Sequence, residues 1–280
     1  PKLGPAKTGV GEAKSGTFDF IKVHAVRDVA VWQTLIDEAA RAGLPTVGHV
    51  TDKIGFIRAI EAGQQVEHLE GVPRAMLPPD SPALKENFGQ VPPPRLAGEL
   101  ARITDADIAR LAAQVKAFGA YQGPTLTLFE RIFDPSVSDE KFLTEPGMEF
   151  MPKPILNEWV QHRGGFWGPS SLTQKSAKGL HDLRRRLVRG FHRAGIPIIA
   201  GSGTPQLYQA YGVGLIREIE TLAGAGLTPA LAGNLDRLAR DDRTAVVLLR
   251  KLEVELELDA SAEPDALARA QYVDALEEIK

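Results

Sequence analysis

Short apolar segments alternate with amphipathic helical segments through most of this chain. Buried strands are predicted at residues 18–25, 45–50, 65–71, 123–129 and 196–200. Predicted helices at 28–44 and 52–64 join the first three strands through turns of a few residues. Parallel strands need a crossover connection of this kind, usually a helix. The alternation therefore predicts an α/β fold with a parallel sheet, built from five strand–helix units.

The ends of the predicted helices carry recognisable signals. Asp28 is expected to cap the helix at 28–44, and Gly43 follows its last apolar turn. Thr104 and Asp107 form a capping-box pattern at the start of a predicted helix at 104–120. Further helices are predicted at 174–194 and 212–226. These signals favour helices between the strands over a purely β fold.

Two long irregular stretches interrupt the alternation, at residues 72–95 and 134–171. Both follow predicted strand ends, where a (β/α) barrel places its active-site loops. Tyr121, Trp159 and Trp167 are candidate walls of a substrate pocket formed there. The alternative is that these aromatic residues pack beneath long loops.

Three regions are expected along the chain. Residues 1–17, rich in Gly, Pro, Lys and Ala, are predicted to be a loop or a poorly ordered end. Residues 18–229 hold the barrel portion. Residues 230–280 lose the strand–helix alternation and form an appendage whose structure the sequence leaves open, between strand and helix.

Composition and net charge limit the kinds of molecule that this protein is expected to bind. The 280 residues have a formal net charge of −3, so nucleic acid and anionic membranes are not expected partners. No apolar run reaches the length of a membrane span. The chain has no cysteine, which excludes disulfides, thiolate ligands and a cysteine nucleophile but leaves the compartment open. A small molecule or dipeptide is the expected partner, and a homo-oligomer remains compatible with the sequence.

Polar side chains mark the ends of three successive predicted strands. Lys22, His49 and His68 lie about one strand–helix unit apart. The carboxyl ends of parallel barrel strands converge on one mouth, where two histidines can bind a divalent metal. A lysine there would repel the ion as an ammonium, but carbamylation by CO2 would turn it into a bridging carboxylate.

Simpler interpretations of these residues stay open. A histidine at a strand end is often only hydrogen-bonded, and Lys22 could instead form an ion pair with Glu67. His24 shares the strand face of Lys22 and could compete for its role. Three carboxylates lie nearby in the sequence, but nothing in the sequence shows where their side chains point; they are Asp52, Glu67 and Glu70.

The segments "FDFIKVHA", "AGLPTVGHV", "AIEAGQQVEHLEG", "PTLTLFERI" and "AGIPIIAGSGTP" together resemble the amidohydrolase superfamily, in particular its imidazolonepropionase-like and Xaa-Pro-dipeptidase-like branch. The resemblance covers residues 18–229. It implies a (β/α)8 TIM-barrel hydrolase holding one or two divalent ions, expected to be zinc. Carbamylated Lys22 would be the bridge on the fourth strand, with His49 and His68 as ligands on the fifth and sixth. The implied activity is hydrolysis of C–N bonds in an amide, cyclic amide or dipeptide.

The chain departs from the pattern of that family in two places. It has no His-x-His pair, which members carry on the first strand, and the resemblance begins near the fourth strand, so the barrel is expected to be incomplete. Gly203 stands where members carry the catalytic aspartate after the eighth strand. Metal-assisted hydrolysis needs a proton acceptor as well as a Lewis acid. The alternative to a hydrolase is therefore a degenerate, non-catalytic barrel that serves in binding or assembly.

Overall fold

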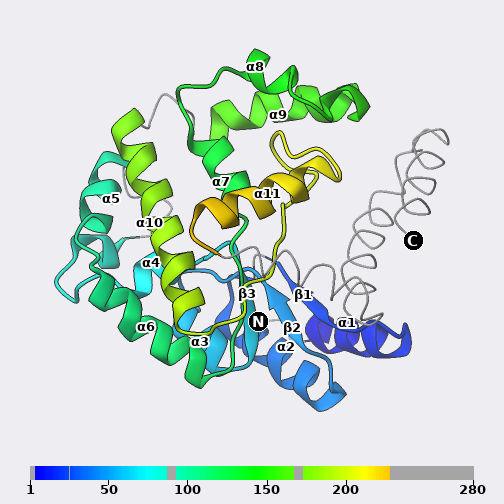
Figure 1. Cartoon of the computed structure of the whole chain (residues 1–280). Coiled ribbons are helices and arrows are strands. Elements are labelled where there is room, and N and C mark those ends of the chain that lie inside the picture. Colours follow the sequence, from blue (N-terminus) through cyan, green and yellow to red (C-terminus); the bar gives the residue numbers. More distant parts are fainter. Residues whose placement is uncertain (1–3, 25, 87–92, 167–172, 228–280) are drawn as a thin grey trace. The chain divides into compact units, whose positions relative to one another are not determined.

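The structure, a computed structural model, describes residues 4–24, 26–86, 93–166 and 173–227 (Figure 1). The chain divides into two units, Pro1–Leu227 and Thr228–Lys280. All described residues belong to the first unit. The appendage predicted at 230–280 and the candidate pocket residue Trp167 lie outside the described residues.

A parallel sheet forms the centre of this unit, as the sequence predicts. Its strands pair in chain order, and they are β1 (Ile21–Val23), β2 (Thr46–Gly48), β3 (Gln64–Glu67) and β4 (Gln122–Gly123). The fifth predicted strand is reduced to a parallel bridge between Gln122 and Ile198. The Gln122 N–H donates to the Pro197 carbonyl at 3.0 Å, and the Ile199 N–H donates to the Gln122 carbonyl at 2.9 Å. This architecture is consistent with part of a (β/α) barrel.

The strand predicted at 123–129 is wrong beyond its first residue. Leu126–Phe133 forms a helix, α7, after Thr125 turns the chain with φ of 45°. The buried carboxylate of Glu218 accepts hydrogen bonds from the N–H groups of Leu126, at 2.8 Å, and Thr127, at 2.7 Å. A short apolar run fits a buried strand and a buried helix equally well. Here Glu218, more than 90 residues away in the sequence, satisfies the first N–H groups of the helix.

The helix boundaries predicted from capping residues are mostly confirmed. Asp28 accepts from the N–H groups at the start of α2 (Val29–Ala42), and Gly43 ends the helix with φ of 73°. The capping box of Thr104 and Asp107 begins α6 (Asp105–Ala117). The helix predicted at 52–64 is shorter, because α3 (Phe56–Glu61) begins only after Gly55.

The first 17 residues are not the loop that their composition predicts. Gly4–Ser15 forms α1, which packs against α2 (Figure 1). Ala6 and Val10 are buried, and their spacing of four places them on one face of the helix. Three glycines within the helix conceal this short apolar stripe in the sequence.

The two irregular stretches contain short helices. The first holds α4 (Val72–Ala75), a 3-10 turn (Pro82–Lys85) and α5 (Pro93–Leu100). The second holds α8 (Asp139–Leu143), a 3-10 turn (Met148–Phe150) and α9 (Lys153–Phe166). Side chains of the second stretch form a hydrophobic cluster with residues that precede α11, and its buried members are Phe142, Met148, Met151, Trp159, Tyr208 and Ala210.

The longest described helix, α10 (Gln174–Arg193), packs against α5, α6 and α7 (Figure 1). The last, α11 (Val213–Gly224), packs against α7. Within the described ranges, no helix combines the length and the apolar character needed to cross a membrane.

Candidate metal centre

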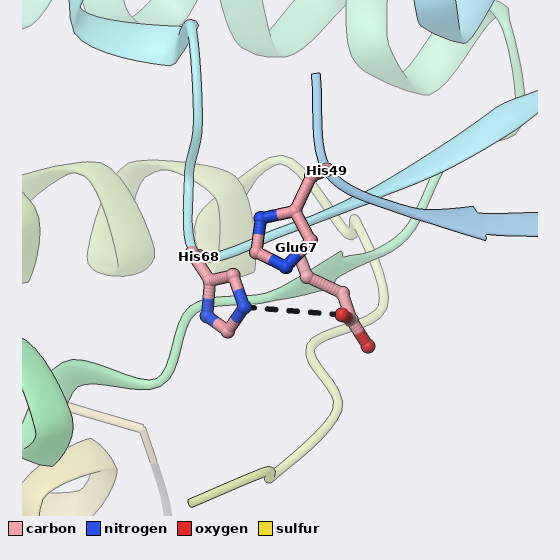
Figure 2. Close-up of side chains that lie close together, drawn as sticks. All are labelled: His49, Glu67 and His68. Carbon is pink, nitrogen blue, oxygen red and sulfur yellow. Dashed lines mark ion pairs between the residues drawn. The ribbon is translucent and has the colours of Figure 1, made fainter. Parts of the chain in front are cut away.

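Three potential metal ligands meet at the carboxyl ends of β2 and β3. His49 directly follows β2, Glu67 is the last residue of β3, and His68 comes next (Figure 2). One ligand atom from each lies within 4.8 Å of the other two. The ring centres of His49 and His68 are 4.8 Å apart. Two imidazoles bound to one ion through Zn–N bonds of about 2.1 Å have ring centres roughly 5 Å apart, so the two rings are spaced as a shared ion requires.

The register of the sheet brings His49 and Glu67 to the same face. Lys22 pairs with Val47, which pairs with Gln65. Neighbouring residues in register point to the same side, and side chains alternate along each strand. His49 lies two residues after Val47, and Glu67 lies two residues after Gln65. Both side chains are therefore on the same face of the sheet as Lys22.

His68 reaches the group through a turn in the backbone. In an extended strand it would point to the face opposite Glu67. Instead, His68 and Leu69 adopt the left-handed region, with φ of 62° and 54°. Non-glycine residues rarely adopt this conformation, and such strain is concentrated at functional sites. The turn directs the imidazole back towards the Glu67 carboxylate, with 3.9 Å between His68 Nε2 and Glu67 Oε2 (Figure 2).

Both imidazoles are held through Nδ1. The Nδ1–H of His49 donates to Glu70 Oε1 at 2.6 Å, and the other carboxylate oxygen of Glu70 accepts from the Val50 N–H at 2.9 Å. His68 Nδ1 lies 2.7 Å from the Thr125 hydroxyl. That hydroxyl donates to the Pro124 carbonyl at 2.9 Å, so it accepts a hydrogen from His68.

An imidazole with its hydrogen on Nδ1 carries a lone pair on Nε2 when the ring is neutral. Burial, with the nearby His49, lowers the pKa of His68 to about 3, which keeps it neutral near pH 7. Metal-binding histidines commonly have this arrangement, with the second nitrogen held by a carboxylate or another polar group. The donor set of two imidazoles and one carboxylate fits a divalent transition metal such as zinc.

Lys22 does not lie free at the centre. Its ammonium forms an ion pair with Glu67 Oε2, the oxygen that faces His68. This is the simpler of the two interpretations that the sequence allows for Lys22. His24 also lies close by, its ring centre 4.7 Å from that of His49.

The turn that carries Gly203 lies beside Thr125, the residue whose hydroxyl bonds His68. A Cβ atom on Gly201 would be 3.9 Å from the methyl group of Thr125. Gly203 has φ of 70°, and a Cβ there would be 2.8 Å from the end of the Leu128 side chain. The turn thus borders α7, next to the threonine that bonds His68.

The candidate pocket residues separate in the structure. Tyr121 is half-buried, and its N–H donates to Gln65 Oε1 at 2.8 Å. Burial, with the Glu67 carboxylate, raises the pKa of the Tyr121 phenol, so this residue lies near the metal centre. Trp159 is 4% exposed and packs edge-on against Tyr208 in the hydrophobic cluster. Its environment therefore favours the packing alternative over a pocket wall.

Sequence reasoning named Glu67 and Glu70 only as nearby carboxylates without a role, and it did not name Thr125, which bonds His68. Glu67 shares the face of His49 through the register of β2 with β3, which the sequence alone does not give. No sequence signal exists for Thr125 either, because its contact with His68 depends on the turn before α7.

The comparisons with known proteins bear on the fold. No protein-family model matches the chain, and no curated protein matches it. Among solved structures, the chain is similar to bottromycin amidohydrolase, with a TM-score of 0.56 and 22% sequence identity. The match covers 80% of this chain and 46% of the other, so the chain spans about half the length of that protein. This similarity shows that the chain shares its fold with part of that protein, and the superfamily branch suggested by the sequence remains a prediction.

Proposed function

We propose that this protein is a metal-dependent hydrolase that cleaves a C–N bond in a small amide, cyclic amide or dipeptide. The observation that carries the proposal is the convergence of His49, Glu67 and His68, each ring held through Nδ1. The similarity of the fold to an amidohydrolase supports the same class of reaction.

Each residue of the centre has a distinct task in this proposal. The Nε2 atoms of His49 and His68 and a carboxylate oxygen of Glu67 would hold the ion, for which zinc is the expected metal. A divalent ion supplies the Lewis acid that hydrolysis of an unactivated amide needs. Glu70 and Thr125 fix the two imidazole planes. Tyr121, near Glu67, would line the substrate side of the centre.

A second candidate is a degenerate barrel that binds a small molecule or serves in assembly without catalysis. Gly203 favours it, because a glycine side chain cannot accept a proton from an attacking water. The ammonium of Lys22 on Glu67 also favours it, because this charge opposes a cation at the same oxygen. Carbamylation of Lys22 by CO2 would remove this opposition and add a carboxylate ligand.

Metal binding tests the first proposal. Zinc and manganese affinities of the purified parent are measured by isothermal titration calorimetry and compared with those of the double variant His49→Ala/His68→Ala. The control is His162→Ala, an exposed histidine on α9 whose Nδ1 lies 3.0 Å from the Glu158 carbonyl of the same helix. We expect the double variant to lose zinc binding and the control to keep it. A parent that binds no divalent ion, or a double variant that binds as the parent does, would contradict the assignment.

Turnover separates the two candidates. The metal-loaded parent is assayed against amides, cyclic amides and dipeptides, with the double variant as the blank. Hydrolysis that disappears in the double variant supports the hydrolase. Tight metal binding without turnover of any substrate in the panel supports the non-catalytic barrel.

A further inference from the structure

A buried arginine on α10 joins the ends of two strands beside the metal centre. Nη2 of Arg184 donates to the His68 carbonyl at 2.9 Å and to the Pro124 carbonyl at 2.7 Å. Its guanidinium carbon lies 4.0 Å from the centre of the Phe129 ring. Arg184 is 9% exposed, so these contacts are made away from solvent.

The two carbonyls that Arg184 holds belong to unusual peptide units. The residue after His68 is Leu69, with φ of 54°, and the residue after Pro124 is Thr125, with φ of 45°. Both are non-glycine residues in the left-handed region, which costs free energy unless the surroundings hold it in place. Each peptide therefore has the same external support, a hydrogen bond from one guanidinium nitrogen.

These two turns decide where the ligand points. The turn at His68 directs its imidazole towards Glu67, and the turn at Thr125 supplies the hydroxyl that accepts from His68 Nδ1–H. If either peptide relaxed, His68 would lose its direction or its tautomer. Arg184 is the group that touches both.

We propose that Arg184 is the positioning residue of the metal centre: by holding the His68 and Pro124 carbonyls, it fixes the orientation and the Nδ1–H tautomer of His68. The proposal rests on the proposed metal site. Arg184 holds the ligand through these two backbone carbonyls, and its positive charge also contributes to the lowered pKa of His68.

The chemistry of arginine suits this task. Burial lowers the pKa of Arg184 to about 10, with the carboxylate of Glu218 among the charges that oppose this shift, so the guanidinium stays charged near pH 7. A charged donor makes stronger hydrogen bonds to carbonyl oxygens than a neutral one. The planar group also stacks on Phe129, which a lysine ammonium would do less well.

The test compares Arg184→Met with a matched control, Arg163→Met. Arg163, on α9, is also buried, donates to two backbone carbonyls and lies over an aromatic ring, but this ring is Phe142 of the hydrophobic cluster. Both variants should lower the melting temperature. Only Arg184→Met should lower zinc affinity, by about 10- to 100-fold, as expected for a residue that orients a ligand. The control should stay within about twofold of the parent.

The tautomer of His68 gives a second readout that a general loss of stability would not change. In metal-free protein, 15N NMR shifts of the imidazole should show hydrogen on Nδ1 in the parent and in Arg163→Met, and a mixture of tautomers in Arg184→Met. Arg184→Lys keeps the charge and should restore part of the affinity. It also carries the test if the methionine variant does not fold.

Several outcomes would overturn the proposal. They are an unchanged zinc affinity and tautomer in the foldable Arg184 variant, or an equal loss of affinity in Arg163→Met. A parent that binds no zinc refutes the proposed function instead, and the His68 tautomer then still decides the role of Arg184.

Discussion

Replacing Lys22 with methionine should strengthen metal binding. The ammonium of Lys22 lies on Glu67 Oε2, the oxygen that would ligate the ion. Methionine has a similar length and removes the positive charge. The side chain of Glu67, 9% exposed, would then face the two imidazoles without the Lys22 ammonium.

The size of the effect follows from Coulomb's law. An ion bound to Glu67 would lie about 4 Å from an ammonium on the same oxygen. At about 4 Å two unit charges repel by about 1 kcal/mol in water and about 4 kcal/mol at an effective dielectric constant near 20, and a divalent ion doubles both values. The Lys22 side chain is 36% exposed and can turn into solvent, so the lower value applies. The expected gain of about 2 kcal/mol corresponds to roughly 30-fold tighter binding.

Zinc titration by calorimetry measures this change, with and without added bicarbonate. The control is Lys178→Met, which removes an exposed lysine from an ion pair with Asp182 on α10. The metal-free Lys22→Met variant should also melt at a lower temperature than the parent, because the ion pair between Lys22 and Glu67 is lost.

Weaker zinc binding in Lys22→Met would refute this reasoning. It would show that Lys22 serves the ion as a ligand, as the carbamylated lysine of the family resemblance does. Bicarbonate should then strengthen binding in the parent but not in the variant. An affinity equal to that of the parent would refute the proposed competition as well.

Three further predictions concern positions around the centre. Gly48→Ala should destabilise the protein by about 3 kcal/mol or more, because its φ is 137° and the new Cβ would lie 2.2 Å from the Val23 carbonyl oxygen; a thermal melt like that of the parent would contradict the strand spacing. Gly203→Asp should lower the melting temperature, because its Cβ meets Leu128, yet raise hydrolysis of the amide panel by about 10²- to 10⁴-fold if the missing acid is the only defect; a stable, metal-loaded variant without a gain would show that it is not. Hydrogen bonds within the capping box lower the pKa of Asp107 to about 2. The stability that Asp107 contributes is therefore present above its ordinary pKa of 3.8 and is lost as the pH falls towards 2. Urea melts of Asp107→Asn should show a smaller loss of unfolding free energy at acid pH, and a loss equal to that of the parent would contradict this prediction.

The sequence was informative about where the candidate ligands gather, because this depends on local rules. Polar residues at the ends of apolar strands converge in any parallel sheet, and His49 and His68 obey that rule. Glu67 was not assigned as a ligand because its direction depends on the register between β2 and β3. The left-handed turn at His68 could not be predicted either, since nothing in "VEHLEG" demands it.

The same contrast holds for the fold. Helices with capping residues, such as α2 and α6, were predicted closely because their end signals lie in adjacent residues. The segment that forms α7 was mistaken for strand because Glu218, the residue that caps its first turn, is distant in the sequence. Local propensity was weak there, and a tertiary contact decided the outcome.

The hydrogen bonds around His68 also bear on the order in which the centre can assemble during synthesis. The three proposed ligands all emerge from the ribosome within one short stretch that ends at residue 68. Glu70, which holds His49, follows at once, but the groups that set the geometry of His68 come much later: Thr125, then Arg184, then Glu218. A nascent chain that has exposed its ligands therefore has no finished site, and contacts of such long sequence separation form slowly. A metal ion that reaches the nascent chain early would find two histidines without a fixed arrangement. A chain halted before Glu218 should therefore bind zinc poorly, although it contains all three proposed ligands.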